Sequence, residues 1–125
     1  MTADEAAGGG EWLPLPDVAE RLGRRLRDVR NLLRDRALAA VRPDEDGPLL
    51  IPSVFLFTAA DGAAEPGPVP SLRGTLIQLA DGGMSIEESV EWLTTEQEEL
   101  GTPPIAALRA RRIHEVRRLA QTVAI

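Results

Sequence analysis

The chain of 125 residues contains no cysteine, no tyrosine and a single histidine, His114. The absence of thiols excludes disulfides, thiolate zinc sites, iron–sulfur clusters and cysteine nucleophiles, and one histidine leaves few metal or acid–base sites. With only two phenylalanines and two tryptophans, the core must be built from aliphatic side chains, which suits small helices. No set of nucleophile, base or metal ligands clusters in the sequence, so we expect no enzyme, no cofactor and no metal.

Long apolar runs are also missing. No stretch approaches the ~18 apolar residues of a membrane span, and the N-terminus, MTADE, is neither basic nor hydrophobic. We therefore expect a cytoplasmic protein without a membrane partner. Lysine is absent as well, because all 14 cations are arginine, and this composition indicates GC-rich coding rather than a binding device.

Charge is distributed unevenly along the chain. The formal net charge of −6 disfavours a nucleic-acid partner if it is spread evenly, because binding to phosphate requires cations. Residues 21–42, however, hold eight arginines against Asp28 and Asp35, a local charge of +6, which leaves six arginines and eighteen acids, −12, elsewhere. A solvated helix face can carry such a run, so the pattern inside the segment decides.

The basic segment has the pattern of two helices joined by a short turn. Pro16 and Asp17 favour the start of a helix that Gly23 ends. A second helix is predicted over 25–36. Its buried stripe consists of apolar residues at helical spacing, namely Leu26, Val29, Leu32 and Leu33.

The opposite face of the second helix carries side chains suited to DNA. In a helix-turn-helix this face enters the major groove, where arginine bonds guanine edges and asparagine bonds adenine edges. The pair Asp46-Gly47, between apolar stretches at 38–42 and 49–51, predicts a β-hairpin wing that contacts the DNA backbone. The predicted DNA-binding residues are Arg24, Arg25, Arg27, Arg30, Asn31, Arg34 and Arg42.

The acidic residues of the predicted wing allow a second interpretation, a calcium site. Asp44, Glu45 and Asp46 are calcium-ligand types, but an EF-hand loop needs more ligands and a closing glutamate at a fixed distance. We therefore favour the hairpin turn over a metal site.

Composition divides the chain into four parts. Residues 1–11 predict a disordered acidic tail, 12–58 a winged helix-turn-helix domain, 59–70 a Pro/Gly linker, and 71–125 a helical C-terminal domain. A short core strand or turn at 54–57 is expected to seal the first domain. The expected fold class is mainly α with a small β-hairpin wing, followed by a three-helix C-terminal lobe.

The three C-terminal helices are predicted from stripes and caps. The first ends at Gly82, the second opens with the capping box of Ser85 and Glu88, and the third runs unbroken from Thr102 to Val123. A last helix of this length can pair with a copy of itself, so a homodimer is expected. The predicted buried residues of the first two helices are Leu72, Thr75, Leu76, Leu79, Ile86, Val90 and Leu93.

Arginines of the last helix are expected to serve structure. The preceding region is rich in glutamate between 87 and 99, and ion pairs with it explain these cations more simply than a ligand does. His114 is expected to be structural or exposed. The arginines concerned are Arg109, Arg111, Arg112, Arg117 and Arg118.

Residues 15–23 (LPDVAERLG) and 34–42 (RDRALAAVR) resemble the winged helix-turn-helix of the MerR and excisionase type. The whole chain resembles a family of small actinobacterial DNA-binding proteins known as substrates of the serine/threonine kinase PknL. This resemblance rests on further motifs at 51–55 (IPSVF), 71–76 (SLRGTL), 81–83 (DGG), 91–93 (EWL) and 114–120 (HEVRRLA).

The family resemblance implies a winged-helix DNA-binding domain, a C-terminal domain of undefined role, and an N-terminal tail phosphorylated on threonine by a partner kinase. The tail of this chain has one threonine, Thr2, which is the candidate phosphosite. Arg24 and Arg25 depart from the motif, which usually has an apolar turn residue and a small cap there, so a more basic turn is expected.

Two functions follow from the sequence. The first is a nucleoid-associated transcriptional regulator that binds double-stranded DNA through the helix at 25–36 and the wing, tuned by phosphorylation of its tail. The alternative is a protein-interaction adaptor that uses the winged-helix scaffold and docks a partner on its acidic C-terminal lobe. Dependence of affinity on salt separates the two.

Overall fold

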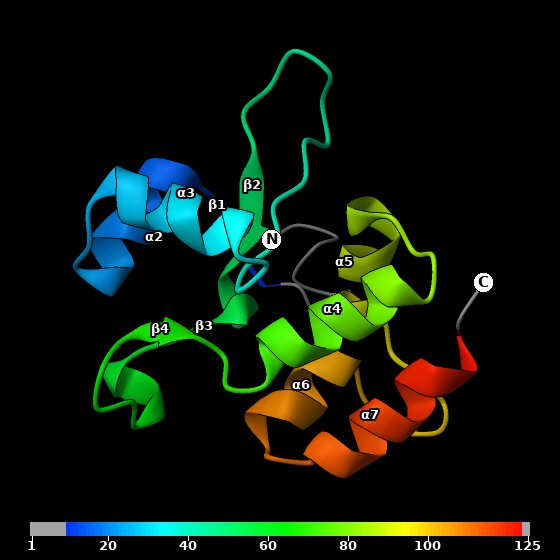
Figure 1. Ribbon diagram of the computed structural model, residues 1–125. Helices are drawn as coiled ribbons and strands as arrows, with labels where there is room; N and C mark the ends of the chain where they lie inside the picture. The colour runs from blue at the N-terminus through cyan, green and yellow to red at the C-terminus, as the bar shows by residue number, and fades with distance from the viewer. Residues whose placement is uncertain (1–9, 124–125) are drawn as a thin grey trace.

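The computed structural model describes residues 10–123. Figure 1 shows a mainly helical chain with two small antiparallel strand pairs, which confirms the predicted fold class. The elements in chain order are β1 (Trp12–Pro14), α2 (Leu15–Leu22), α3 (Leu26–Arg34), β2 (Leu50–Pro52), the 3-10 helix η1 (Ser53–Phe55), β3 (Leu56–Phe57), the 3-10 helix η2 (Ala59–Asp61), β4 (Gly67–Pro68), α4 (Leu72–Asp81), α5 (Ile86–Thr94), α6 (Pro104–Arg109) and α7 (Ile113–Thr122).

The helix-turn-helix forms at the predicted place. Helix α2 has Pro16 and Asp17 in its first turn and ends at Gly23, whose left-handed φ of 66° favours glycine. The chain then turns at once into α3, because the amide of Arg24 donates to the carbonyl of Ala19 at 2.9 Å. Helix α3 spans Leu26–Arg34 and is therefore shorter at both ends than the predicted 25–36.

The wing is a loop with a minimal ladder at its base. Val41 and Leu50 form one antiparallel bridge, with N···O distances of 2.9 and 2.7 Å. The regular partner of β2 is β1, in which Leu13 lies opposite Ile51. The predicted hairpin of 38–42 with 49–51 is thus reduced to one bridge, because the flanking Pro43 and Pro48 have no amide to extend the ladder.

Residues 59–70, which composition predicts to be a linker, belong to the folded body. They contain η2 and β4, and β4 pairs with β3 so that Phe57 lies opposite Gly67. Val69 is buried, and its amide donates to the carbonyl of Phe55 at 2.8 Å. The glycines and prolines of this segment therefore shape a tight return of the chain rather than a free connection.

The first two C-terminal helices follow the predicted pattern, with one exception. The stripe of α4 is buried, and the capping box of α5 forms, with the Ser85 amide 2.8 Å from Glu88 Oε1 and the Glu88 amide 3.1 Å from Ser85 Oγ. Ile86 was predicted to be buried and is instead 58% exposed. The reason is that Ile86 lies at the rim of an open cavity between α4 and the end of α3.

The last predicted helix is two helices. Arg111 adopts a left-handed φ of 65°, and the Arg112 amide donates to the Ala107 carbonyl at 2.9 Å, which closes a turn between α6 and α7. The described part of the C-terminal region therefore holds four helices and not three. The break also removes the long helix on which the expected homodimer depends.

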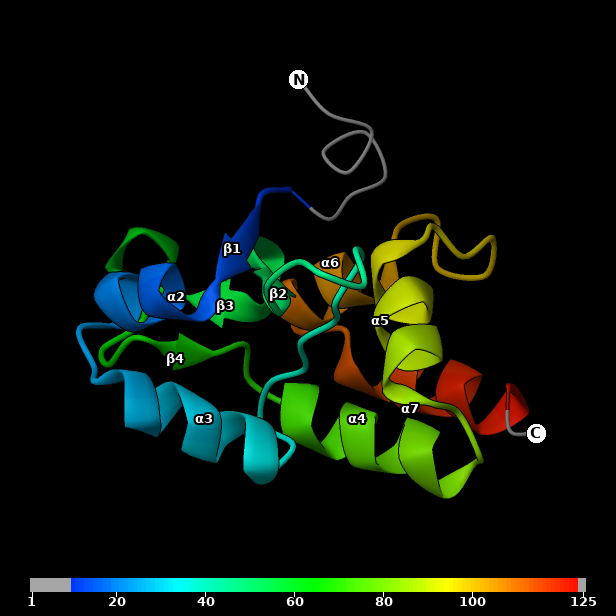
Figure 2. The same cartoon turned by 90° about the horizontal axis from the view of Figure 1, so that it is seen from above.

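Both halves of the chain share one hydrophobic core. A single cluster of buried apolar side chains runs from the helix-turn-helix into the C-terminal helices. Phe55 sits between the halves in sequence and has no exposed surface, as is true of Leu72 in α4 and Leu108 in α6. Figure 2 shows α3 and α4 following one another along the same side of the molecule.

Candidate nucleic-acid interface

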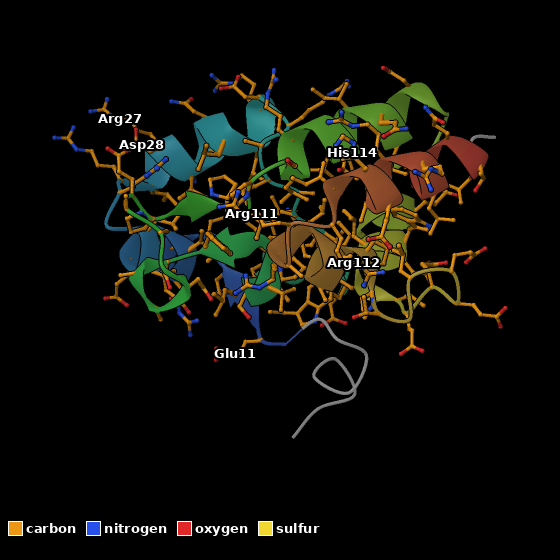
Figure 3. All side chains as sticks on the ribbon, turned by 90° about the horizontal axis from the view of Figure 1, so that it is seen from below. Glu11, Arg27, Asp28, Arg111, Arg112 and His114 are labelled. Atoms are coloured by element: carbon orange, nitrogen blue, oxygen red, sulfur yellow. The ribbon has the colours of Figure 1, made fainter. Side chains whose placement is uncertain are left out.

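One face of α3 presents four polar side chains to solvent. Residues spaced by three and four positions lie on the same side of a helix, and all four are exposed. Figure 3 shows Arg27 pointing away from the body at the amino end of α3. Within residues 10–123, none of the four side chains makes a hydrogen bond or ion pair. The face, called the α3 polar face below, consists of Arg27, Arg30, Asn31 and Arg34.

The opposite side of α3 anchors the helix only lightly. Val29 is fully buried, whereas the other predicted stripe residues, Leu26, Leu32 and Leu33, are half-buried. The helix therefore lies on the surface of the molecule with its polar face outward. This placement is the one that a groove-reading helix needs.

Arg24 and Arg25, both predicted to bind DNA, lie in the turn before α3. Arg24 is exposed, but its Nη2 donates to the carbonyl of Pro66 at 2.8 Å. The Arg25 amide donates to the Asp28 carboxylate at 3.1 Å and so caps α3. The Arg25 side chain is exposed and has no protein partner in the described chain.

The wing carries charge of both signs. Arg42 is exposed at its base, and its Nη1 donates to the carbonyl of Gly47, which closes the loop. The tip is acidic, since Asp44, Glu45 and Asp46 are all exposed. Phosphates are repelled by such a tip, so the wing offers a cation only at its base.

Two arginines near the interface were not predicted. Arg36, just after α3, is exposed and has a left-handed φ of 62°. Arg73 of α4 donates from Nε to the carbonyl of Asp35 at 3.0 Å. Arg36 belongs to the basic run and was detectable by its charge, but the contact of Arg73 spans 38 residues and has no local sequence signal.

Arg109 joins α6 to the segment around β3. Its Nη1 donates to the carbonyls of Val54 at 3.0 Å and Leu56 at 2.7 Å, and its Nη2 pairs with the Asp61 carboxylate. The guanidinium carbon lies 5.3 Å from the centroid of the Phe57 ring. The hydrogen bond from the Thr58 amide lowers the pKa of Asp61 below its ordinary value, and the positive charge of Arg109 lowers it further.

The expected ion pairs with the glutamates of 87–99 were wrong. In the described chain Arg109 pairs with Asp61, and Arg112, which directly precedes α7, pairs with Glu115 in the first turn of that helix at 2.8 Å. The hydrogen bond from Arg112 lowers the pKa of Glu115. Arg111, Arg117, Arg118 and His114 are exposed, and Figure 3 shows Arg111, Arg112 and His114 along α6 and α7.

Other predicted sites have simpler outcomes. Within residues 10–123 no three acidic or histidine side chains gather as a metal site, and no helix is long and apolar enough to cross a bilayer. Thr2, the candidate phosphosite, lies outside the described residues. The interface therefore rests on α3 and its flanks.

Comparisons with known proteins identify the family. Two family models match, "DNA-binding protein Rv2175c, wHTH domain" over residues 3–56 and "Rv2175c C-terminal domain of unknown function" over residues 69–124. The DNA-binding protein Rv2175c of Mycobacterium tuberculosis is 37% identical over 122 residues, covering 88% of this chain and 78% of the relative. The NMR structure of Rv2175c is similar with a TM-score of 0.76 and 34% identity, covering 93% of this chain and 82% of that chain. The whole-chain resemblance to a family of winged-helix DNA-binding proteins is thus confirmed, and this chain belongs to the Rv2175c family, a family of winged helix-turn-helix DNA-binding proteins and not of enzymes.

Proposed function

We propose that the protein is a nucleoid-associated transcriptional regulator that reads double-stranded DNA with α3 in the major groove. The observation that carries this proposal is the α3 polar face, which is exposed and free of protein partners among the described residues. Arginine and asparagine are the side chains that bond guanine and adenine edges. Arg25, at the amino end of the helix, is placed to add a phosphate contact.

Arg42 is the residue through which the wing contacts the DNA backbone. The Arg42 guanidinium has five N–H donors. The bond to the Gly47 carbonyl uses only some of them, so other donors remain for a phosphate. The acidic tip at 44–46 favours a pose in which the base of the wing, not its end, approaches the duplex. Arg24 has a smaller role in this pose because it is held by Pro66.

The test is a triple substitution in the full chain, Arg27→Ala with Asn31→Ala and Arg34→Ala. A matched control removes two exposed arginines and one exposed amide from α7 and its flank, namely Arg111→Ala with Arg117→Ala and Gln121→Ala. Each lost bidentate base contact costs about 1–3 kcal/mol, so affinity for a selected duplex should fall about 100-fold or more in the α3 variant. Unchanged affinity in a folded α3 variant would refute the groove assignment.

A protein-interaction adaptor is the second candidate function. It is favoured by six exposed glutamates on α5 and the following loop, none of which is ion-paired in the described chain: Glu87, Glu88, Glu91, Glu96, Glu98 and Glu99. Salt separates the candidates. Binding to a duplex that neutralises about four phosphates gives a slope of log K against log salt near −3.6, whereas an adaptor shows no such salt-dependent binding to a duplex.

We further propose that phosphorylation of Thr2 by a serine/threonine kinase lowers DNA affinity. The tail also carries Asp4 and Glu5, and a phosphate adds about −1.5 to −2 charges that compete with DNA for arginine. The test is to phosphorylate the purified protein, map the site, and compare DNA affinity with that of Thr2→Ala at fixed salt. Equal affinities with and without the phosphate remove the switch.

A further inference from the structure

We propose that the C-terminal domain, to which the family assigns no function, sets the position of α3 on DNA, with Arg73 as the positioning residue. The inference rests on the proposed role of α3 in reading DNA. Arg73 lies in the second position of α4, and its Nε donates to the carbonyl of Asp35, the residue directly after α3, at 3.0 Å. A side chain of one domain thus holds the end of the recognition helix in the other.

The carboxyl end of α3 gains a charged partner from α4. The carbonyls of Leu32 and Leu33 accept from the amides of Ala37 and Arg36, and the guanidinium of Arg73 adds a donor to the carbonyl of Asp35 beside the negative end of the helix dipole. The chain leaves α3 through Arg36, which has a φ of 62°. Residues with a side chain rarely adopt this left-handed conformation. Local turn bonds and the contact from Arg73 therefore hold this helix end together.

Apolar packing at this end is incomplete. Leu33, in the last turn of α3, is half-buried and faces a cavity of about 270 Å³ whose far wall includes Leu76 and Met84. Side chains beside a cavity lack dispersion contacts on that side, so apolar packing holds this helix end less firmly than a closed core would. The bond from Arg73 adds a polar contact to this end, at the point where Figure 2 shows α4 following α3.

The amino end of α3 is tied to the same domain by a second route. Arg24 holds the carbonyl of Pro66, next to β4, at 2.8 Å. Strand β4 pairs with β3, and the β3 carbonyl of Leu56 accepts from Arg109 of α6 at 2.7 Å. Both ends of α3 are therefore connected through arginines to the C-terminal helices, in addition to the packing of α3 against α2.

The position of α3 on the duplex matters more for recognising bases than for binding phosphate. Bidentate contacts to base edges require a fixed helix orientation, whereas long arginine side chains follow phosphates over a range of orientations. Loss of Arg73 should therefore reduce discrimination between sequences and leave general affinity for DNA almost intact. A direct phosphate contact by Arg73 would have the opposite signature.

The experiment uses the full chain and a duplex selected by the wild type from a random library, with poly(dI-dC) as the non-specific reference. Arg73→Gln removes the charge, Arg73→Lys retains a donor that can reach the carbonyl, and Arg117→Gln is a control with the same charge change at an exposed arginine of α7. We expect Arg73→Gln to bind the selected duplex about three- to tenfold more weakly, with unchanged poly(dI-dC) affinity and salt slope. Arg73→Lys should recover part of the loss, and Arg117→Gln should keep full discrimination.

Hydrogen exchange gives an independent readout. The amides of Asp35 and Ala37, which donate to Asn31 and Leu32 in α3, should exchange faster in Arg73→Gln than in the Arg117→Gln control. Unchanged exchange or unchanged discrimination in Arg73→Gln overturns the proposal. Equal losses on both duplexes, with the salt slope reduced by about 0.9, also overturn it because they mark a phosphate contact.

The same binding series separates this proposal from the function on which it rests. The α3 triple-alanine variant is measured beside Arg73→Gln, at a temperature where circular dichroism shows both to be folded. Retained discrimination in the α3 variant refutes α3 as the reading helix, whatever Arg73 does. Lost discrimination in the α3 variant together with full discrimination in Arg73→Gln refutes only the positioning role.

Discussion

The arginines of α3 and those of the C-terminal helices are the same side chain in two different uses. In the described chain, Arg27, Arg30 and Arg34 have no partner and point into solvent. Arg109 and Arg112 donate to backbone carbonyls and carboxylates of their own chain. Charge alone does not distinguish these uses. What differs is whether carbonyl and carboxylate acceptors lie within reach. Unoccupied donors alone do not mark a binding arginine, because Arg111, Arg117 and Arg118 are exposed as well; the α3 polar face differs by gathering arginines and an asparagine on one face of a surface helix.

The largest expected effect is on stability, from Arg109→Ala. Its side chain is 27% exposed and satisfies two carbonyls and Asp61, so its loss leaves acceptors unpaired between α6 and β3. We expect the free energy of unfolding to fall by about 2–4 kcal/mol, measured by urea denaturation. Arg111→Ala, which removes an exposed arginine two residues away, should have little effect. Similar midpoints for the two variants would erase the distinction between the two arginine sets.

The reverse outcome is expected for the α3 polar face. Arg30→Ala should lower DNA affinity by about 1 kcal/mol while leaving the urea midpoint unchanged, because the side chain contacts no described residue. Arg112→Ala is the counterpart, and it should leave DNA affinity unchanged. Fluorescence anisotropy with one labelled duplex measures both, and a larger affinity loss in Arg112→Ala than in Arg30→Ala would contradict the assignment of the interface.

Salt dependence sharpens the same division. Removing one arginine that neutralises a phosphate should make the slope of log K against log salt shallower by about 0.9. We expect this change for Arg25→Ala, whose side chain flanks the amino end of α3, and no change for Arg118→Ala on α7. Titrations at several salt concentrations decide the matter, and equal slopes for both variants would remove Arg25 from the phosphate contacts.

The smallest expected effect concerns pH. Because the pKa of Asp61 is lowered in the folded protein, its carboxylate contributes stability that is present above the unfolded pKa near 3.9 and is lost as pH falls through the folded pKa. The urea midpoint of unfolding should therefore decrease as the pH is lowered below about 4, and it should decrease less steeply in Asp61→Asn than in the wild type. An identical acid limb in the two proteins would show that the Arg109–Asp61 pair is not coupled to folding.

Local sequence signals predicted much of the fold. Gly23 marked the end of α2, and the Ser85 and Glu88 pair marked the start of α5, because caps and turns are decided by residues three or four apart. The α3 polar face followed from helical spacing in the same way. Its exposure and its lack of partners in the described chain agree with that prediction, although contact with DNA stays a prediction.

Features that depend on distant contacts were missed. The partners of Arg109 lie 48 to 55 residues away, so no local pattern distinguished them from the nearer glutamates. The left-handed Arg111 that separates α6 from α7 occupies a position that apolar periodicity treats as continuous helix. The residues at 59–70 have the composition of a linker, yet their return against β3 is fixed by pairing with a strand that composition does not reveal.

The shared core has a consequence for how the protein is made. The helix-turn-helix leaves the ribosome before α6, yet the buried Phe55 belongs to one apolar cluster with Leu72 and Leu108 of the second half. Domains generally fold as units, N-terminal first, during synthesis. Because the core is shared, we expect the first half to complete its packing only after the second half has been synthesised. Expression yield should therefore fall when residues beyond α5 are truncated, because the first half is left without its core.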